Sequence, residues 1–284
     1  MEKTFLDLSF GEKIKHKMLH DKRSLLSVLA DKAAVKDLVF RLIGDEYVVP
    51  NYSVFENESE LDFTAYPRQF VLKPTHGSQA GILVHEQYER YQKQLLPIYQ
   101  TWGSYFKIHP ADLDRNIGFF KVMARRWLNS QYRPDAEFCY KAIPPKVIVE
   151  KYIEAIPKNT LNDFRFYTFH GQVKFFRAAT GPTNDIANYA YDENGIFLPI
   201  RATHDEVEYN EKYLPELPRQ WSKMKELAEK LSMGIDFVRI DFILSDAQVY
   251  FSEFTNYPMA GHIAFLPESF DKIVSSWWRK FDCC

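Results

Sequence analysis

Two segments near the end of the chain combine the alternation of a β-strand with charged residues. In Phe237–Leu244 (FVRIDFIL), Arg239 and Asp241 are two residues apart, so we expect them on one face of a strand, with their apolar neighbours facing the core. A second strand, predicted over Val249–Thr255 after the turn SDAQ, carries Glu253. If the strands pair as a hairpin, both carboxylates converge beside the arginine. The C-terminal part of the chain is therefore predicted to be antiparallel sheet with a polar cluster on one face.

This polar cluster has two interpretations. Two carboxylates, together with an oxygen from Thr255 or Asn256, form a hard-oxygen site suited to Mg²⁺ and to the phosphates that Mg²⁺ holds. An arginine beside such a site stabilises negative charge on a phosphoryl group during its transfer. The alternative is a salt bridge across a surface hairpin, which is common and contributes little. Segments further upstream favour the first interpretation.

A short apolar segment in the first third of the chain ends in a lysine and a glycine-bearing turn. Phe70–Lys73 (FVLK) is followed by PTHGSQAG and by a second predicted strand, Ile82–Val84. Glycines let backbone N–H groups approach a phosphate, and Lys73 supplies a mobile positive charge. The alternative is an ordinary hairpin loop. We interpret His76 as a loop hydrogen-bonding residue rather than a catalyst.

Two more segments carry groups that suit a nucleotide. Lys32 lies in the first turn of a helix that Asp31 caps and Gly44 ends. Helix N-termini favour anions, although a lysine there is usually solvated. The predicted strand Lys146–Tyr152 (KVIVEKY) leads into backbone that suits the edge of a base, and Glu154 could accept from ribose hydroxyls. The alternative for this segment is an ordinary strand exit.

The order of the remaining elements indicates the fold class. Periodicity and turn residues predict helices over 22–29, 86–132 and 221–233, a short strand over 48–50, long strands over 163–169 and 173–178 around a turn at His170–Gly171, and an irregular excursion over 182–218. Helices and strands do not alternate as βαβ units, so the expectation is an α+β architecture.

Composition excludes some classes of protein. The chain has 284 residues, 46% of them apolar, and a formal net charge of −2. That charge gives no basic surplus for a nucleic-acid partner. The three cysteines have no zinc or disulfide spacing, and we expect Cys283–Cys284 to be a frayed tail rather than a lipidation site. With no signal peptide and no apolar stretch of membrane-spanning length, we expect a cytoplasmic protein without a transmembrane segment.

The succession of these segments resembles the ATP-grasp superfamily. It runs from Asp-Lys-x-x-x-Lys through Val-Leu-Lys-Pro with Gly-Ser-x-x-Gly, Val-Glu-Lys-Tyr-Ile-Glu and Arg-Ile-Asp-Phe to Glu-x-Thr-Asn-x-Pro. FVLKPTHGS, DFRFYTFHGQVKFF and FVRIDF followed by YFSEFTNYPMAG are most similar to its TupA-like family, named for teichuronopeptide biosynthesis. The resemblance implies an ATP-grasp fold with antiparallel sheets, flanking helices and a nucleotide held between two subdomains. The expected parts are a helical N-terminal region (1–68), a small subdomain with the phosphate loop (69–150) and a large subdomain with the metal site (151–284).

The resemblance also implies roles for matching residues. The residues expected to contact ATP are Lys32 and Lys73 at the phosphates, His76, Gly77, Ser78 and Gly81 in the covering loop, Glu150, Lys151, Tyr152 and Ile153 at the adenine, and Glu154 at the ribose. Asp241 and Glu253 are expected to hold Mg²⁺, while Arg239 steadies the acyl phosphate and the tetrahedral intermediate.

The second metal element departs from the Glu-x-Asn of many superfamily members. Here Thr255 has that spacing from Glu253, and Asn256 follows one residue later, on the other strand face unless a bulge intervenes. We favour Asn256, because an amide oxygen is a better Mg²⁺ ligand than a hydroxyl. Further candidates for phosphate or substrate contacts on the central strands are Arg165, Lys174 and Arg177.

The implied activity is that of an ATP-dependent carboxylate–amine ligase with an acyl-phosphate intermediate. By family analogy it joins an amino acid or amine to a carboxylate in cell-surface polysaccharide or peptide biosynthesis. The tyrosines of 182–218 could cover a sugar or form a structural flap; they are Tyr189, Tyr191, Tyr209 and Tyr213. The alternatives are a kinase of a sugar hydroxyl, a glycosyltransferase and a non-catalytic nucleotide sensor. For the glycosyltransferase, the only Asp-x-Asp match is Asp112–Leu–Asp114, in a predicted helix.

Overall fold

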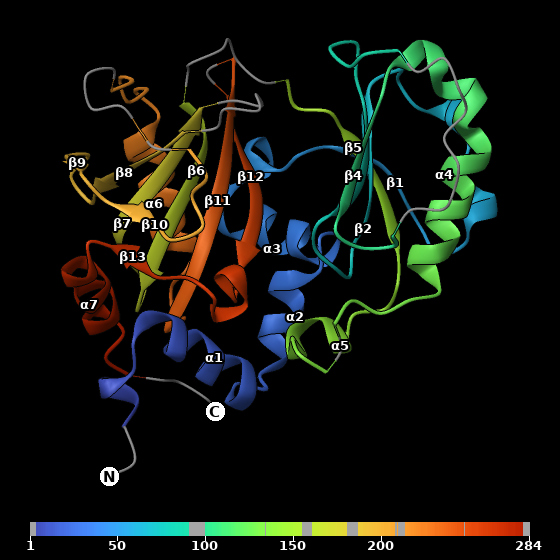
Figure 1. Cartoon of the computed structure of the whole chain (residues 1–284). Coiled ribbons are helices and arrows are strands. Elements are labelled where there is room, and N and C mark those ends of the chain that lie inside the picture. Colours follow the sequence, from blue (N-terminus) through green and yellow to red (C-terminus); the bar gives the residue numbers. More distant parts are fainter. Residues whose placement is uncertain are drawn as a thin grey trace. The chain divides into compact units, whose positions relative to one another are not determined.

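The computed structural model describes most of the chain and divides it into two compact units (Figure 1). The described residues are 4–90, 100–133, 135–154, 161–180, 187–207, 209, 214–246 and 248–280. The first unit comprises residues 1–26, 38–48 and 154–284, and the second comprises 27–37 and 49–153. Each unit is built around its own sheet.

The first unit contains a six-stranded antiparallel sheet in the order β12-β11-β6-β7-β8-β9. The strands are β6 (Leu161–Phe169), β7 (Gln172–Thr180), β8 (Asn188–Asp192), β9 (Phe197–Leu198), β11 (Phe237–Ser245) and β12 (Gln248–Thr255). A separate two-stranded sheet pairs β10 (Arg201–Ala202) with β13 (Phe265–Leu266). The predicted C-terminal hairpin and the two long central strands are thereby confirmed.

Helices cover both faces of this sheet. The buried residues of α6 (Trp221–Leu231), at i, i+3, i+4 and i+7 from Met224, pack on β6, β7 and β11. On the opposite face, Phe10 of α1 (Phe10–His20) contacts the rings of Tyr167 and Phe237, and Trp277 of α7 (Glu268–Trp277) contacts Phe175. The large aromatic content of the chain therefore goes mainly into the core of this unit.

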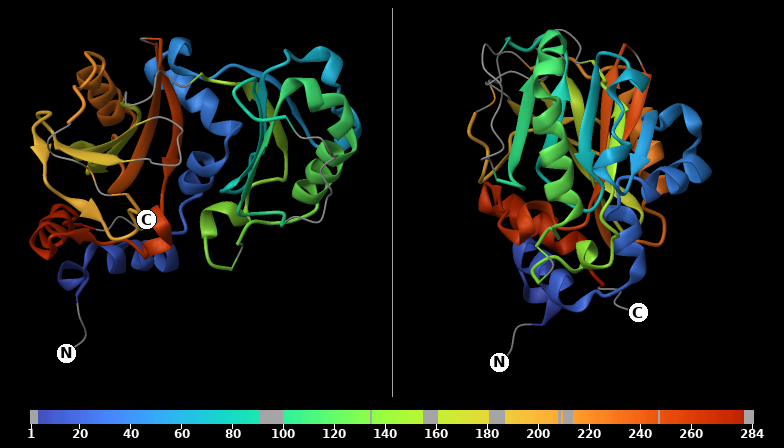
Figure 2. Two further views of the ribbon diagram at one scale, coloured as in Figure 1. Left: turned by 45° about the horizontal axis from the view of Figure 1, so that its top comes forward. Right: turned by 90° about the vertical axis from the view of Figure 1, so that its right-hand side faces the viewer.

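The second unit is a five-stranded sheet with α4 (Leu113–Leu128) along one face (Figure 2). Its strand order is β1-β5-β2-β3-β4. The bounds are β1 (Asn51–Phe55), β2 (Phe70–Pro74), β3 (Ala80–Val84), β4 (Ser104–Ile108) and β5 (Val147–Lys151). All neighbours are antiparallel except β3 and β4, which are parallel. The predicted hairpin of 70–73 with 82–84 is confirmed.

Two N-terminal helices, α2 (Ser24–Ala30) and α3 (Ala34–Ile43), each contain a boundary between the two units. A further short helix, α5 (Phe138–Lys141), belongs to the second unit. The side chain of Asp31 accepts from the backbone N–H groups of Ala33 (2.9 Å) and Ala34 (3.3 Å), which confirms the predicted cap. The 3₁₀ turns are Phe5–Asp7, Asp45–Tyr47, Glu58–Glu60, Phe63–Ala65, Pro110–Asp112 and Pro258–Gly261.

Several sequence-based boundaries were wrong. The predicted helix over 86–132 contains β4, whose alternately exposed and buried residues Tyr105, Phe106, Lys107 and Ile108 have the period of a strand. The predicted irregular excursion contains β8, β9 and β10. The strand expected at 48–50 begins instead at Asn51, and Gly81 lies in β3 rather than in the preceding loop. In each case pairing between strands overrides the local pattern.

Candidate functional site

The charged residues of the C-terminal hairpin meet on one face of the six-stranded sheet. Asp241 of β11 is the register partner of Glu253 of β12. Arg239 donates from Nε to Oδ1 of Asp241 at 2.8 Å and from a terminal nitrogen to Oδ2 at 2.5 Å. It also reaches Oε1 of Glu253 at 3.5 Å. The neighbours Val238, Ile240 and Phe242 are fully buried on the other face, so the predicted convergence is confirmed in geometry.

The environment of this cluster shifts the pKa values of its charged side chains. Burial raises the pKa of Asp241 to about 6, although the Arg239 guanidinium opposes this shift. The pKa of Arg239 is also raised, because Asp241 and Glu253 outweigh its own burial. Glu253 is far more exposed than Asp241, with 42% of its side chain accessible against 7%. The cluster therefore offers one buried and one accessible carboxylate with a cation fixed between them.

Asn256 and Thr255 are placed differently beside these carboxylates. Thr255 lies opposite Arg239 in the ladder, and its hydroxyl donates to Oε1 of Glu253 at 3.3 Å. Asn256 is buried; its Nδ2 donates to the carbonyl of Leu26 at 3.0 Å, whereas its Oδ1 has no hydrogen-bond partner within the described residues. A bulge does occur in β12, but it falls between Phe251 and Glu253.

A buried amide oxygen without a partner suits a cation. Burying an acceptor unpaired is costly, so such an atom calls for an ion or water. The carboxylates of Asp241 and Glu253 are hard oxygen donors of the kind that fits Mg²⁺, and the oxygen of Asn256 remains a further candidate ligand. Within the described ranges, no group of three or more His, Cys, Asp or Glu side chains is arranged to hold a metal ion.

Two arginines extend the row of charges across the sheet. Arg165 of β6 is the register partner of Asp241 on one side and of Arg177 of β7 on the other. Arg165 is held by Asp163 (2.6 Å) and by the amide oxygen of Asn188 (3.2 Å). The row Glu253, Asp241, Arg165, Arg177 therefore runs from two anions to two cations over four adjacent strands.

Arg177 and Asp205 form a buried ion pair that the sequence did not reveal. Both are at most 4% exposed, and a guanidinium nitrogen of Arg177 lies 2.5 Å from each carboxylate oxygen. Asp205 also accepts from the backbone N–H of Ala202 at 2.8 Å and from Asn188 at 3.3 Å. The pair fixes the turn after β10 to the sheet, so Arg177 is committed to structure rather than free for an anion.

Lys174 does not join the other two candidates. It occupies the bulge of β7, where Tyr167 pairs with Phe175 and Thr168 pairs with Val173. Its Nζ donates to the amide oxygen of Gln172 at 2.9 Å, at the turn end of the strand. Bulges redirect side chains, and this one separates Lys174 from the row of Arg165 and Arg177.

In the second unit, Glu150 is bound by two lysines. Its Oε1 lies 2.7 Å from Nζ of Lys36, and its Oε2 lies 2.5 Å from Nζ of Lys73. Burial alone would raise the pKa of Glu150, but Lys73 and Lys36 outweigh it and hold that pKa below its usual value. Burial lowers the pKa of Lys36, and Glu150 offsets part of that shift. Two cations thus share one buried anion.

Lys36 is the residue that sequence reasoning missed. Its spacing of four from Lys32 in the Asp-Lys-x-x-x-Lys segment was the available signal, because residues four apart share a helix face. The side chain of Glu150 was expected near adenine but instead contacts the lysines. Its buried place near the end of β5, a strand that lies between β1 and β2, explains why it needs charged partners.

The glycine-bearing turn is anchored on one side. His76 and Gly77 are buried; Nε2 of His76 lies 3.0 Å from the carbonyls of both Trp127, in the last turn of α4, and Ser130, just after it. The carbonyl of Gly77 accepts from Nζ of Lys32. Ser78 and Gln79 form the more accessible tip, where Gln79 has a φ of 53°. His76 is therefore a hydrogen-bonding residue, as expected.

β5 ends at Lys151, close to the end of the strand predicted over Lys146–Tyr152. Lys151 is the last residue paired with β2, and its backbone N–H donates to the carbonyl of Pro50 at 2.9 Å. Tyr152 turns inward, where its ring stacks on His85 at 4.3 Å and its hydroxyl meets that of Tyr88 at 2.9 Å. Ile153 and Glu154 continue beyond the ladder, and Glu154 is exposed.

The remaining candidates are the tyrosines of 182–218, the Cys283–Cys284 tail and the Asp-x-Asp match. Tyr189 and Tyr191 are buried in β8 and belong to the core, while Tyr209 contacts Phe197. Tyr213 and the Cys283–Cys284 tail lie outside the described residues. Asp112 is buried at the start of α4 and pairs with Arg90, whereas Asp114 is exposed. The two carboxylates of the Asp-x-Asp match therefore do not converge on one ion.

A family profile decides where this chain belongs. The profile of TupA-like ATPgrasp proteins matches residues 12–277. The chain is a member of the TupA-like ATP-grasp family. Its α+β architecture is accordingly an ATP-grasp fold. The search of curated proteins gives no match to this chain.

Solved structures similar to this TupA-like protein are distant in sequence. D-alanine–D-alanine ligase from Bacillus anthracis has 15% identity and a TM-score of 0.44, with 89% of this chain and 66% of that one covered. ATP-grasp ligase PsnB with its minimal precursor has 10% identity and a TM-score of 0.41, with coverages of 82% and 53%. VanG D-Ala:D-Ser ligase from Enterococcus faecalis has 15% identity and a TM-score of 0.41, with coverages of 90% and 62%. The chain thus spans 53% to 66% of these proteins' lengths.

Among the described helices of the TupA-like protein, none combines the length and apolar character needed to span a membrane.

Proposed function

We propose that this protein is an ATP-dependent ligase that activates a carboxylate as an acyl phosphate and joins it to an amine. The observation that carries the proposal is the pairing of Asp241 with Glu253 beside Arg239, which reaches both carboxylates. Such a set holds a divalent cation and stabilises phosphoryl charge within one site. Membership of the TupA-like ATP-grasp family supports it.

We propose a role for each residue of the cluster. Asp241, Glu253 and Asn256 would hold Mg²⁺, which when bound neutralises charge on the phosphates of ATP. Arg239, fixed by both carboxylates, would stabilise the transferring phosphoryl group and the tetrahedral intermediate that follows. Arg165, partly exposed and next to Asp241 in the ladder, would bind the substrate carboxylate.

The second unit would bind the rest of the nucleotide. Lys36 and Lys73 supply two cations against the one buried charge of Glu150, and this surplus favours a phosphate anion. Lys32, bound to the carbonyl of Gly77, would add a third phosphate contact from the turn. The tip at Ser78 would cover the phosphates. The backbone from Lys151 to Ile153, where the ladder with β2 ends, would meet the adenine edge, and Glu154 the ribose.

In the proposed reaction the substrate carboxylate attacks the γ-phosphorus of ATP, and ADP leaves. An amine then attacks the acyl carbon, inorganic phosphate leaves, and the amine gives up a proton. Positioning and electrostatics supply the catalysis, so no covalent bond to the protein is needed. We propose cell-surface polysaccharide or peptide biosynthesis as the setting, on the basis of the family alone.

Hydroxylamine distinguishes the proposed ligase from a kinase. With ATP, Mg²⁺ and a pool of candidate carboxylates, including hexuronates and amino acids, we expect hydroxylamine to trap an acyl phosphate as a hydroxamate and to accelerate ADP release. A Glu268→Gln variant, altered in an exposed carboxylate of α7, is expected to behave as wild type. ADP release that ignores hydroxylamine and leaves a stable phosphorylated sugar would establish the kinase instead.

A further inference from the structure

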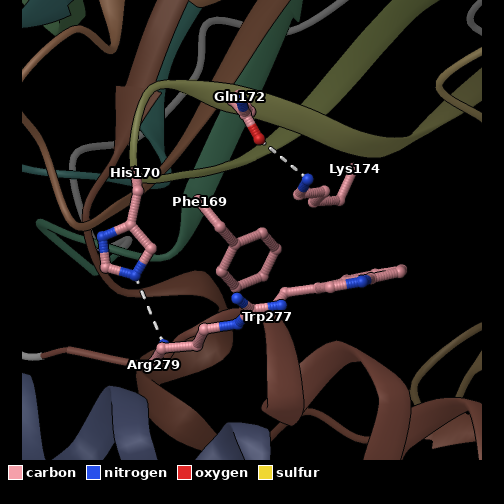
Figure 3. Close-up of a pocket in the computed structure, with 6 residues that line it drawn as sticks. All are labelled: Phe169, His170, Gln172, Lys174, Trp277 and Arg279. Atoms are coloured by element: carbon pink, nitrogen blue, oxygen red, sulfur yellow. Dashed lines mark hydrogen bonds between the residues drawn. The ribbon is translucent and has the colours of Figure 1, made fainter.

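A hollow of about 310 Å³ lies at the turn end of β6 and β7, beside the end of α7, in the first unit. It is lined by Phe169, His170, Gln172, Lys174, Trp277 and Arg279. Figure 3 shows the ring of Phe169 between His170, Lys174 and the side chains from the end of α7. Four residues along β6 separate Phe169 from Arg165, or about 13 Å at ~3.3 Å per residue. The hollow is therefore distinct from the Asp241 cluster.

The lining offers hydrogen-bond donors and positive charge. Lys174 binds only the neutral amide of Gln172, and the guanidinium of Arg279 has no ion-pair partner among the described residues. No carboxylate lines the hollow as the structure describes it. The indole N–H of Trp277 likewise has no hydrogen-bond acceptor in the described part of the chain. Such a surface favours an anionic ligand rich in oxygen acceptors.

The backbone is built to place Lys174 there. The bulge of β7 leaves Lys174 without a partner on β6, at the cost of a local break in the ladder. Beside it, Trp277 is only partly buried, although its ring packs against those of Phe169, Phe175 and Phe270. The hollow thus joins two cations to a partly exposed aromatic side chain, a combination that suits a ring-shaped acid rather than a bare phosphate.

We propose that this hollow binds an acidic sugar, a pyranose unit bearing a carboxylate. The carboxylate contacts Lys174 and Arg279, the apolar face of the sugar ring lies on Trp277, and hydroxyl oxygens accept from the amide of Gln172. A volume at the lower end of the range for ligand pockets admits a ligand of about one or two such rings. The inference stands on this hollow alone; combined with the proposed ligase, the occupant is a neighbouring unit of an acidic acceptor chain.

Calorimetric titration with a tetrasaccharide of galacturonic acid tests this site. The matched ligand is the same tetrasaccharide with its carboxyl groups reduced to alcohols. We expect the acidic ligand to bind the wild-type protein at least about tenfold more tightly than the reduced one. We expect the double variant Lys174→Gln/Arg279→Gln to lose at least about tenfold in affinity. Lys272→Gln, altered in an exposed lysine of α7, should bind as wild type.

Two further readouts separate the proposed ligand from others. A Trp277→Phe variant keeps an aromatic ring, and we expect it to lose the tryptophan fluorescence change on saccharide binding while retaining part of the affinity. Equal binding of the acidic and reduced ligands, or an unaltered affinity of the double variant, would overturn the proposal. So would tighter binding of tetraglutamate or ATP through the same two cations. The hydroxylamine assay tests the proposed ligase separately, so failure of that assay with saccharide binding intact leaves this inference standing.

Discussion

Glu150 shows how a single buried charge can prepare a site for an anion. It holds Lys36 and Lys73 at 2.7 Å and 2.5 Å, so both ammonium groups stay in place on the second unit. One carboxylate cannot neutralise two lysines, and a phosphate that approaches Lys73 meets a cation already oriented. Lys36 can keep Glu150 paired when Lys73 turns to a ligand. We therefore propose that Lys36 is a positioning residue, acting through Glu150.

This role predicts a specific effect of Lys36→Met. Without Lys36, Glu150 keeps Lys73 as its remaining partner, and we expect affinity for both ATP and inorganic tripolyphosphate to fall at least about tenfold. Lys36→Arg should restore most of it, and Lys121→Met, in an exposed lysine of α4, should have no effect. Titration calorimetry with tripolyphosphate isolates the phosphate contribution, because that probe has no base. Wild-type affinity in a folded Lys36→Met protein would contradict the role.

His76 predicts how stability depends on pH. Burial lowers the pKa of His76 below its ordinary value of 6.5, although the carbonyls of Ser130 and Trp127 oppose the shift. As pH falls through about 6.5, the unfolded chain takes up this proton before the folded protein does, so the free energy of unfolding decreases. The slope from this one group is at most about 1.4 kcal/mol per pH unit.

Urea unfolding at about pH 7.5 and about pH 5.5 checks this expectation. His76→Gln removes the titrating group, so we expect its stability to change less between the two pH values than that of the wild type. His262→Gln, in an exposed histidine, should retain the wild-type difference. An unchanged difference in His76→Gln would assign the pH dependence to other groups.

At the scale of elements, the turn between β2 and β3 depends on packing more than on flexibility. A Cβ at Gly77 would lie 2.4 Å from the ring of Trp102 and 2.9 Å from the Cβ of Tyr132. At Gly81, in β3, the corresponding contacts are 3.3 Å to the ring of Tyr105 and 3.4 Å to the carbonyl of Leu72. The backbone at Gly77 is therefore packed tightly against its neighbours, whereas the backbone at Gly81 has more room.

We therefore expect Gly77→Ala to cost more than Gly81→Ala. Overpacking typically costs about 1–3 kcal/mol, and Gly77→Ala should lie in the upper part of that range because two rigid neighbours must move. It should also weaken ATP binding, because the carbonyl of Gly77 accepts from Lys32. Thermal and urea denaturation of the two variants, side by side, measures the difference. A smaller loss for Gly77→Ala than for Gly81→Ala would show that the turn is loosely packed.

The elements also show what the sequence could and could not predict. The alternation in 237–244 was enough to predict that Arg239 and Asp241 share a face, since strand geometry alone decides it. It could not predict β4, whose period-2 pattern is only five residues long and whose partner β3 is distant in the chain. The bulge that redirects Lys174 and the buried place of Glu150 depend on cross-strand pairing, which local patterns do not contain.

At the scale of the whole molecule, the chain divides into two units with complementary chemistry. The first carries the carboxylates, Arg239 and the partnerless oxygen of Asn256, and the second carries the lysines around Glu150. The predicted subdomain limits at residues 68 and 150 stay predictions; contacts assign residues 27–37 to the second unit and 38–48 to the first. The proposed function requires both groups to act on one nucleotide.

A thermal-shift comparison of ATP, ADP and UDP-sugars, each with and without Mg²⁺, tests this central claim most directly. Ligands that bind the folded state raise its stability, by roughly 2.7 kcal/mol when present at about 100 times their Kd. We predict stabilisation by ATP that increases with Mg²⁺, loss of the Mg²⁺ increment in Asp241→Asn and Glu253→Gln, and no effect of UDP-sugars. Stabilisation by a UDP-sugar but not by ATP, or an undiminished Mg²⁺ increment in both variants, would contradict the account.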